Sequence, residues 1–280
     1  MTRRWLVTGG SSGLGRALAE AVAASGDLVA VTARRTAALD TLVAAWPEHI
    51  VPIPLELRDA DACEEAVRIA CDRLGGVDVL VNNAGGGLFG AVEEVSDAEL
   101  RDQLEVLVVG PWRMTRLVLP GMRARGAGCV VNVSSLGGRM PFPGLASYVT
   151  GKHALEGMSQ ALAAEVGGFG VRVLVVEPGV FATRYGASLA EPAAPVPAYA
   201  EVNGPMLAEF RGMADNPEYG RPEDFAAAVL ALVRAEAPVP VRVPVGEDAY
   251  AYLEAVTEAG HAEFAAARAL TRDLRAAPPR

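Results

Sequence analysis

The sequence predicts a single α/β domain built on a doubly wound, seven-stranded parallel sheet flanked by helices. Three observations favour this fold class. Seven short apolar runs alternate with stretches rich in alanine and leucine that suit helices. Most of the runs are apolar throughout, as strands are when helices cover both faces of a sheet. A glycine-rich turn also joins the first run to the first helical stretch, a sequence typical of nucleotide-binding α/β folds.

Each expected element follows from this alternation. The expected strands are Trp5–Thr8, Leu28–Thr32, Ile50–Pro54, Val77–Val81, Cys129–Val133, Val171–Val176 and Pro240–Val245. The expected helices lie at 14–25, 36–46, 60–74, 98–125, 147–167, 222–235 and 248–275. No linker or repeat divides the chain, so we expect one domain over residues 1–280, with a disordered tail at 276–280.

Composition limits the partners of the protein. The net charge is −9 and no basic stripe is visible, which argues against nucleic acid as a partner. No run reaches the ~18 consecutive apolar residues of a membrane helix, and no signal peptide is recognised. The three cysteines have neither disulfide nor metal-site spacing. We therefore expect a cytoplasmic protein with a small-molecule partner, no membrane association and no bound metal.

The glycine-rich turn predicts a site for a dinucleotide. It reads Thr8-Gly9-Gly10-Ser11-Ser12-Gly13-Leu14-Gly15 and lies between the first strand and the first helix. Gly9 permits a tight turn, Gly13 lets the backbone approach a pyrophosphate, and Gly15 lets the helix pack closely on the strand. The free N–H groups of the helix N-terminus then face the phosphates.

The end of the second strand indicates which nicotinamide cofactor is bound. An acidic residue there would bind the ribose hydroxyl groups of NAD. The chain has Ala33 at this position, followed by Arg34 and Arg35. Guanidinium groups suit a 2′-phosphate, so we expect NADP, with Arg34 as its main contact. The alternative is a pair of solvated arginines in a loop.

Tyr148 and Lys152 are the first candidates for catalysis. The two residues are one helical turn apart on the same helix face. An ammonium group at ~4 Å would lower the pKa of the phenol from about 10 by up to about three pH units. The pair could then transfer protons near neutral pH. Ser135 lies thirteen positions before Tyr148.

The glycine loop, Ser135 and the Tyr148–Lys152 pair together resemble the short-chain dehydrogenase/reductase family, over roughly residues 3 to 183. Three further segments agree with it, namely Asn82-Asn83-Ala84-Gly85, Asn132-Val133-Ser134-Ser135 and the loop Glu177 to Thr183. The resemblance implies a Rossmann-like fold in which Tyr148 is the general acid or base, Ser135 binds the carbonyl oxygen and Lys152 assists Tyr148 and binds the nicotinamide ribose. The cofactor contacts implied by the motifs and the loops are Gly9, Ser11, Ser12, Gly13, Leu14, Gly15, Arg34, Arg35, Glu56, Leu57, Asn83, Ala84, Gly85, Tyr148, Lys152, Pro178, Gly179, Val180 and Thr183.

The chain departs from the family pattern at two places. Leu107 stands where the family usually has an asparagine, which holds a water molecule that connects the lysine to solvent. Leucine has no hydrogen-bonding group, so the proton path must be rerouted or weakened. Glu56-Leu57 replaces the usual Asp-Val near the adenine, and the longer carboxylate can still reach it.

Residues 184–220 do not follow the alternation of strands and helices. They contain five prolines and scattered aromatic residues, and they are long for a connection in a compact domain. We interpret them as a lid over the substrate, the alternative being a surface excursion with one or two short helices.

These features favour an NADPH-dependent ketoreductase or alcohol dehydrogenase that acts on a medium-sized, rather apolar ketone or secondary alcohol. Two alternatives remain open, namely a non-catalytic NADP-binding sensor and an epimerase or dehydratase of the same fold. The segments 98–125 and 147–167 resemble the helices that form the family's dimer interface, which implies a homodimer or homotetramer.

Overall fold

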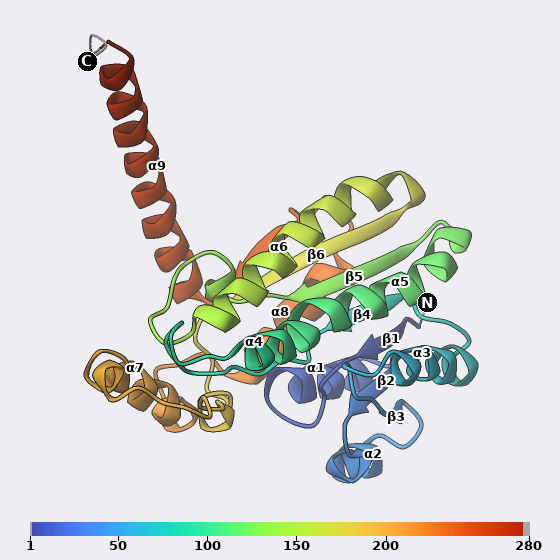
Figure 1. Cartoon of the computed structure of the whole chain (residues 1–280). Coiled ribbons are helices and arrows are strands. Elements are labelled where there is room, and N and C mark those ends of the chain that lie inside the picture. Colours follow the sequence, from blue (N-terminus) through green and yellow to red (C-terminus); the bar gives the residue numbers. More distant parts are fainter. Residues whose placement is uncertain (1, 277–280) are drawn as a thin grey trace.

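The structure, a computed structural model, describes residues 2–276 and has the predicted seven-stranded parallel sheet (Figure 1). The strand order is β3-β2-β1-β4-β5-β6-β7. The strands are β1 (Arg4–Val7), β2 (Leu28–Ala33), β3 (Ile50–Pro54), β4 (Val79–Asn82), β5 (Gly128–Val133), β6 (Val171–Pro178) and β7 (Arg242–Val245). The chain reverses its direction of winding between β1 and β4, and such a switch point is where α/β folds bind ligands.

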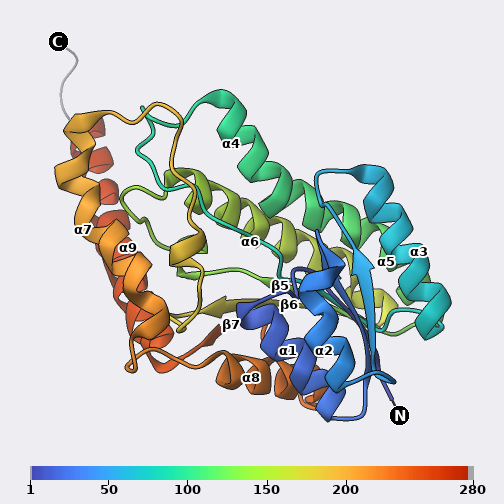
Figure 2. The same cartoon turned by 90° about the horizontal axis from the view of Figure 1, so that it is seen from below.

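Helices cover both faces of the sheet, and Figure 2 shows these two layers. They are α1 (Gly13–Ala24), α2 (Asp40–Ala45), α3 (Ala60–Leu74), α4 (Asp97–Leu104), α5 (Gly110–Arg125), α6 (Ala146–Val166), α7 (Ala200–Gly212), α8 (Pro222–Arg234) and α9 (Glu247–Ala276). One core cluster joins the sheet to α1, α2 and α8, and a second joins it to α3, α5 and α6. Among the described residues, no helix is long and apolar enough to cross a membrane.

The predicted elements agree with the structure to within about two residues at most boundaries. Two predicted helices differ in detail. The helix expected at 36–46 begins with a 3-10 turn, Thr36–Leu39. The helix expected at 98–125 consists of α4 and α5 joined by a π-helical turn, Glu105–Val109. Pro111, just after this turn, has no N–H to donate to the carbonyl of Leu107, so one α-helical hydrogen bond is missing there.

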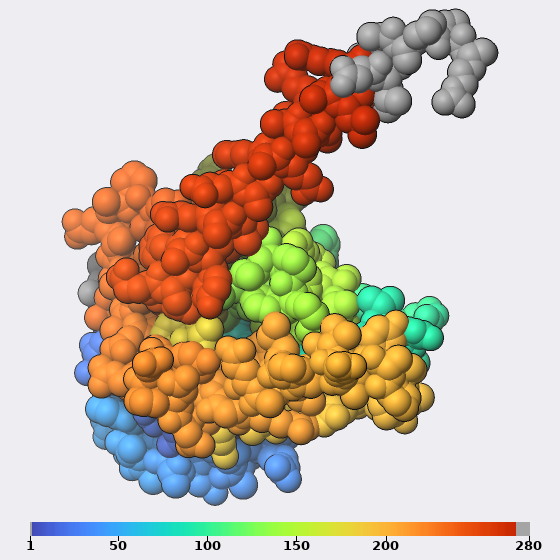
Figure 3. Space-filling view, turned by 90° about the vertical axis from the view of Figure 1, so that its left-hand side faces the viewer, coloured from blue at the N-terminus to red at the C-terminus, as the bar shows by residue number. Residues whose placement is uncertain are grey.

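The C-terminal part of the chain comprises a segment that crosses one face of the molecule and a helix that projects from it. Residues 184–220, gold to orange in Figure 3, run across one face of the molecule. The first turns of α9 pack on the body through Ala249 and Leu253, which contact Leu136. Beyond them α9 projects into solvent, with residues 257–272 exposed (Figures 1 and 3). The expected disordered tail lies outside the described residues apart from Ala276, which ends α9, and the expected oligomer stays a prediction.

Candidate active site

Tyr148 and Lys152 lie near the N-terminus of α6, on the helix face that is turned to the sheet. Tyr148 is 9% exposed and Lys152 is 5% exposed. The ammonium Nζ of Lys152 donates a hydrogen bond of 2.7 Å to the carbonyl of Val133, at the end of β5. It lies 5.6 Å from the centre of the Tyr148 ring. The end of β5 therefore anchors the lysine beside the tyrosine.

The expectation that Lys152 lowers the pKa of Tyr148 is wrong for this structure. Burial raises the pKa of Tyr148, and interactions with the hydroxyl groups of Ser135 and Tyr185 oppose that effect only in part. Burial also lowers the pKa of Lys152 to about 8, although the charge of Glu156 works in the opposite direction. Sequence spacing predicted the proximity of the pair correctly, but it does not show how deeply both groups are buried.

Ser135 begins the turn after β5 and lies beside Tyr148. Its Oγ accepts a hydrogen bond of 3.1 Å from the N–H of Gly137. A Cβ on Gly137 would lie 3.1 Å from Cε1 of Tyr148 and 3.6 Å from Ser135 Oγ. Because Gly137 has no side chain, the tyrosine ring can pack against this turn. The structure thus brings Ser135, Tyr148 and Lys152 together at the carboxyl edge of the sheet.

Tyr185 is a site residue that the sequence analysis missed. Its ring centre lies 5.6 Å from that of Tyr148 and 6.3 Å from that of Phe210, which belongs to α7. Its hydroxyl group is buried and acts on that of Tyr148, but it makes no hydrogen bond of normal geometry. Burial raises its pKa well above the ordinary value, and the nearby Tyr148 adds to this effect. The only signal in the sequence was an aromatic residue two positions after Thr183.

An apolar cover lies over Tyr148. Residues from the 184–220 segment and from the loops around it form a cluster with the tyrosine, comprising Phe89, Leu107, Leu145, Leu189, Met206, Leu207 and Phe210. Glu93, Glu94 and Glu99 accept hydrogen bonds from residues 193–199 and hold this segment on the body. The position agrees with the predicted lid, whose role stays a prediction.

Leu107 fills the space beside Lys152. It is 1% exposed. A Cβ on Gly151 would lie 2.8 Å from Leu107 Cδ1, and one on Gly85 would lie 3.1 Å from its Cδ2 and 3.9 Å from Lys152 Nζ. The leucine therefore packs between two glycines, and on this side it offers the lysine no hydrogen-bonding group.

The predicted phosphate loop is tied to the loop after β4. Gly9 has a φ of +72°, a conformation that favours glycine. Asn83 donates from Nδ2 to the carbonyls of Thr8 and Gly9, at 2.9 and 3.2 Å. A Cβ on Gly15 would lie 2.3 Å from this Nδ2 and 2.5 Å from the Gly9 carbonyl oxygen. Any side chain at Gly15 would therefore force α1 away from the sheet.

The remaining predicted cofactor contacts surround this loop. Ser12 precedes α1 with an extended backbone, and its side chain makes no capping bond, so the first N–H groups of α1 stay available. Ser11 and Leu14 lie in the same turn, and Ala84 and Gly85 follow Asn83. Gly13 lies opposite Thr183, whose Cγ2 would be 3.6 Å from a Cβ on the glycine. The loops after β1, β4 and β6 therefore converge.

The loop after β6 depends on an acidic residue that the sequence did not reveal. Asp248, in the first turn of α9, accepts a hydrogen bond of 2.7 Å from the N–H of Val180. A Cβ on Gly179 would lie 2.2 Å from Oδ1 of this aspartate. Asp248 thereby fixes the segment that follows Pro178, where the nicotinamide is expected.

At the adenine end, the two arginines after β2 are exposed. Neither Arg34 nor Arg35 makes an ion pair with an acidic residue of the described chain. Glu56 forms an ion pair of 3.0 Å with Arg58, whereas the side chain of Leu57 belongs to the second core cluster. Available guanidinium groups and the lack of a carboxylate at Ala33 fit a 2′-phosphate.

A family comparison agrees with this geometry. The family model described as short chain dehydrogenase matches residues 3–194. The chain belongs to the short-chain dehydrogenase family. Among curated relatives, "Oxidoreductase BOA17" of Botryotinia fuckeliana is 37% identical over 254 residues, which cover 90% of this chain and 92% of that protein. The family membership and the sheet make this chain an oxidoreductase.

Solved structures of the family have the same fold. A short-chain dehydrogenase from Streptomyces avermitilis is 44% identical, with a TM-score of 0.86 and coverage of 97% of both chains. An alcohol dehydrogenase from Thermococcus sibiricus, complexed with 5-hydroxy-NADP, is 26% identical with a TM-score of 0.71, covering 88% of this chain and 96% of that one. A 3-ketoacyl-(acyl-carrier-protein) reductase from Brucella melitensis, complexed with NADH, is 26% identical with a TM-score of 0.73, covering 87% and 97%.

Proposed function

We propose that this protein is an NADPH-dependent reductase of apolar ketones, which also runs in reverse on secondary alcohols. The observation that carries the proposal is the position of Tyr148. Its ring lies beside Ser135 and Lys152 at the carboxyl edge of the sheet and packs under the apolar cover. When bound, NADPH supplies a hydride to the carbonyl carbon.

The residues of the chain supply the proton and the orientation. Tyr148 gives its proton to the carbonyl oxygen, and its raised pKa keeps it protonated until that oxygen becomes basic. The Ser135 hydroxyl group holds the same oxygen. Lys152, fixed by the Val133 carbonyl, returns a proton to Tyr148. The apolar cover excludes water and favours a substrate without charge.

The test of this function is NADPH consumption with a panel of ketones. Tyr148→Phe removes the proton donor and keeps the ring, and it should lower the turnover rate by about 10²–10⁴-fold. Tyr252→Phe, at an exposed tyrosine of α9, is the matched control and should leave the rate unchanged. Equal rates in Tyr148→Phe and wild type would refute the assignment of Tyr148.

The cofactor preference has its own support and its own test. Two of the family's solved structures are named as complexes with NADP-type cofactors and one as a complex with NADH, and the two free arginines of this chain favour NADPH. Arg34→Ala should weaken NADPH binding by about 10- to 100-fold, the value of a lost charge-assisted hydrogen bond. NADH binding should be unaffected. The exposed Arg68→Ala on α3 is the control, and equal losses for both cofactors would contradict the NADPH proposal.

A further inference from the structure

The two sides of Lys152 differ in chemistry. On one side lies Leu107, which has no hydrogen-bonding group. On the other side, one helical turn along α6, lies Glu156. The two residues are four positions apart on α6, and the charge of Glu156 raises the pKa of Lys152, although their side chains are too far apart for a direct ion pair. An ammonium has three N–H donors, and the structure shows one of them bonded, to Val133.

Glu156 is a buried carboxyl group without the usual partners. It is 4% exposed, and its side-chain oxygens make no hydrogen bond of normal geometry, although the Ser134 hydroxyl group acts on them. The hydroxyl group of Ser134 is also buried and unpartnered. A Cβ on Gly138 would lie 2.5 Å from Ser134 Oγ and 3.1 Å from Glu156 Oε1. The two oxygen atoms therefore lie close to each other, beside Gly138. A carboxyl group in such a place is able to take up and release a proton.

The charged groups around Glu156 come from each element packed against it. Burial raises its pKa, the Ser134 hydroxyl group at the end of β5 lowers it, Glu177 of β6 raises it, and Arg242 of β7 and Arg139 lower it. Lys152 lies on its own helix. Glu156 can therefore be protonated at a pH where an exposed glutamate is ionised.

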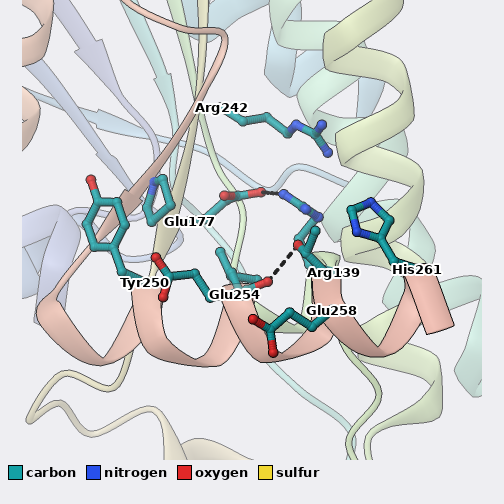
Figure 4. Close-up of a pocket in the computed structure, with 10 residues that line it drawn as sticks. Arg139, Glu177, Arg242, Tyr250, Glu254, Glu258 and His261 are labelled. Atoms are coloured by element: carbon teal, nitrogen blue, oxygen red, sulfur yellow. Dashed lines mark hydrogen bonds and ion pairs between the residues drawn. The ribbon is translucent and has the colours of Figure 1, made fainter.

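A cavity that opens to solvent adjoins Arg139, the residue that follows Gly138. Its volume is about 500 Å³, and Arg139, Glu177 and Arg242 line it together with residues of α9 (Figure 4). Glu177 is fully buried. Its Oε1 accepts a bond of 3.1 Å from Arg139, and its Oε2 has no partner. The cavity is polar and large enough for water. Glu156 Oε1 lies against Gly138, and Arg139 of the cavity wall directly follows that glycine, so the carboxyl group lies close to the wall.

We propose that Glu156 is a positioning residue that relays protons between Lys152 and water in this cavity. The relay rests on the proposed reductase function. After Tyr148 has given its proton to the carbonyl oxygen, the Lys152 ammonium gives a proton to the tyrosinate. The Glu156 carboxyl group then gives its proton to the Lys152 amine by way of a water molecule between them. Water in the cavity returns a proton to the Glu156 carboxylate past Glu177, so each turnover draws one proton from solvent.

The decisive variant is Glu156→Gln, which keeps the size of the side chain and cannot relay a proton. The first turnover uses the proton already on Tyr148, so stopped-flow measurement should show an unchanged first-turnover rate of NADPH oxidation. Later turnovers need a new proton and should slow by about 10²-fold or more. The slowing should increase with pH, because solvent then supplies fewer protons. Glu165→Gln, exposed on the same helix, is the matched control.

Rescue with a small acid provides a second readout. Glu156→Ala leaves room for formate beside Lys152, and added formate should restore its later turnovers in a saturable way. Formate should not accelerate wild type or Glu165→Ala. The formate experiment also tests the relay if the Glu156→Gln variant does not fold.

The outcomes separate the relay from the reductase function. If wild type oxidises NADPH with a ketone and Tyr148→Phe does not, the reductase function stands. Unchanged later turnovers in Glu156→Gln would then overturn the relay alone, as would an equal slowing of first and later turnovers, which indicates a structural role. Failure of formate to rescue Glu156→Ala would also overturn it. If wild type shows no turnover that depends on Tyr148, the reductase function itself fails.

Discussion

Buried polar groups have hydrogen-bond partners at the amino edge of the sheet, whereas several at the carboxyl edge lack them. At the amino edge, Asp27 accepts hydrogen bonds from the backbone of Arg3, from Trp5 Nε1 and from Arg234, at 2.8, 3.0 and 2.9 Å. At the carboxyl edge and in the segment that covers it lie all the buried side-chain atoms of the described residues that lack a partner. They belong to Asn82, Ser134, Glu156, Glu177, Tyr185 and Asn203.

This difference separates the part of the molecule that stabilises the fold from the part that performs chemistry. Folded proteins leave few buried polar groups without partners, because each one destabilises the fold. Proteins retain such groups where a ligand or a proton must be bound. The carboxyl edge is also where parallel α/β folds bind ligands. We therefore expect substitutions at the two edges to change stability in opposite directions.

The largest effect is expected at the amino edge. Asp27→Ala removes an almost fully buried carboxylate and leaves Trp5 Nε1 and Arg234 without their partner. Breaking such a buried pair should lower the free energy of unfolding by about 3–5 kcal/mol, measured by denaturant titration. Asp72→Ala, at an exposed ion pair on α3, is the control and should change it by about 1 kcal/mol or less. If Asp27→Ala lowers the free energy of unfolding by no more than Asp72→Ala does, the proposed difference between the two edges is wrong.

A smaller effect of opposite sign is expected at the carboxyl edge. Tyr185→Phe removes a buried hydroxyl group that makes no hydrogen bond of normal geometry, so it should raise the free energy of unfolding by about 1–3 kcal/mol. Because the same hydroxyl group faces the site of Tyr148, the KM for a ketone should rise as well. Tyr252→Phe, at an exposed position, should change neither quantity. A Tyr185→Phe variant that is less stable than wild type would show that the hydroxyl group supports the fold.

Sequence alone predicted the strands of the sheet and the position of the glycine loop well. The strands were found because both faces of a parallel sheet are apolar, so each strand is a continuous apolar run. The glycine loop was found because its spacing must admit a turn and a close helix at once. The predicted helix at 98–125 was correct in extent but not in form, since the π turn depends on how Pro111 and its neighbours pack.

The carboxyl edge was predicted less well, because its properties depend on tertiary contacts. Spacing placed Lys152 beside Tyr148, but not the Val133 carbonyl that holds the lysine or the burial that raises the pKa of the tyrosine. Tyr185 and Asp248 reach the site from segments far along the chain. Glu156 follows Lys152 by one turn, yet nothing in the sequence shows that its carboxyl group is buried without partners.

The smallest expected effect is a difference in pH dependence between the two buried carboxyl groups. Although burial alone would raise the pKa of Asp27, hydrogen bonds from Arg3, Arg234 and Trp5 hold it below the ordinary 3.8. The stability that Asp27 contributes is therefore present above pH 3.8 and is lost as the pH falls through the lowered pKa. Asp27→Asn should approach wild type in stability only under such acidic conditions.

The pH dependence of stability that Glu156 contributes has the opposite sign to that of Asp27. Burial raises its pKa above the ordinary 4.5, so the folded state holds a proton that the unfolded state has lost. Wild type should therefore lose stability relative to Glu156→Gln as the pH rises from 4.5 through the raised pKa, by at most about 1.4 kcal/mol per pH unit. Thermal unfolding of both proteins over a pH series measures this difference. A constant difference would mean that Glu156 keeps an ordinary pKa, and a group that does not hold its proton toward neutral pH is a poor donor to Lys152.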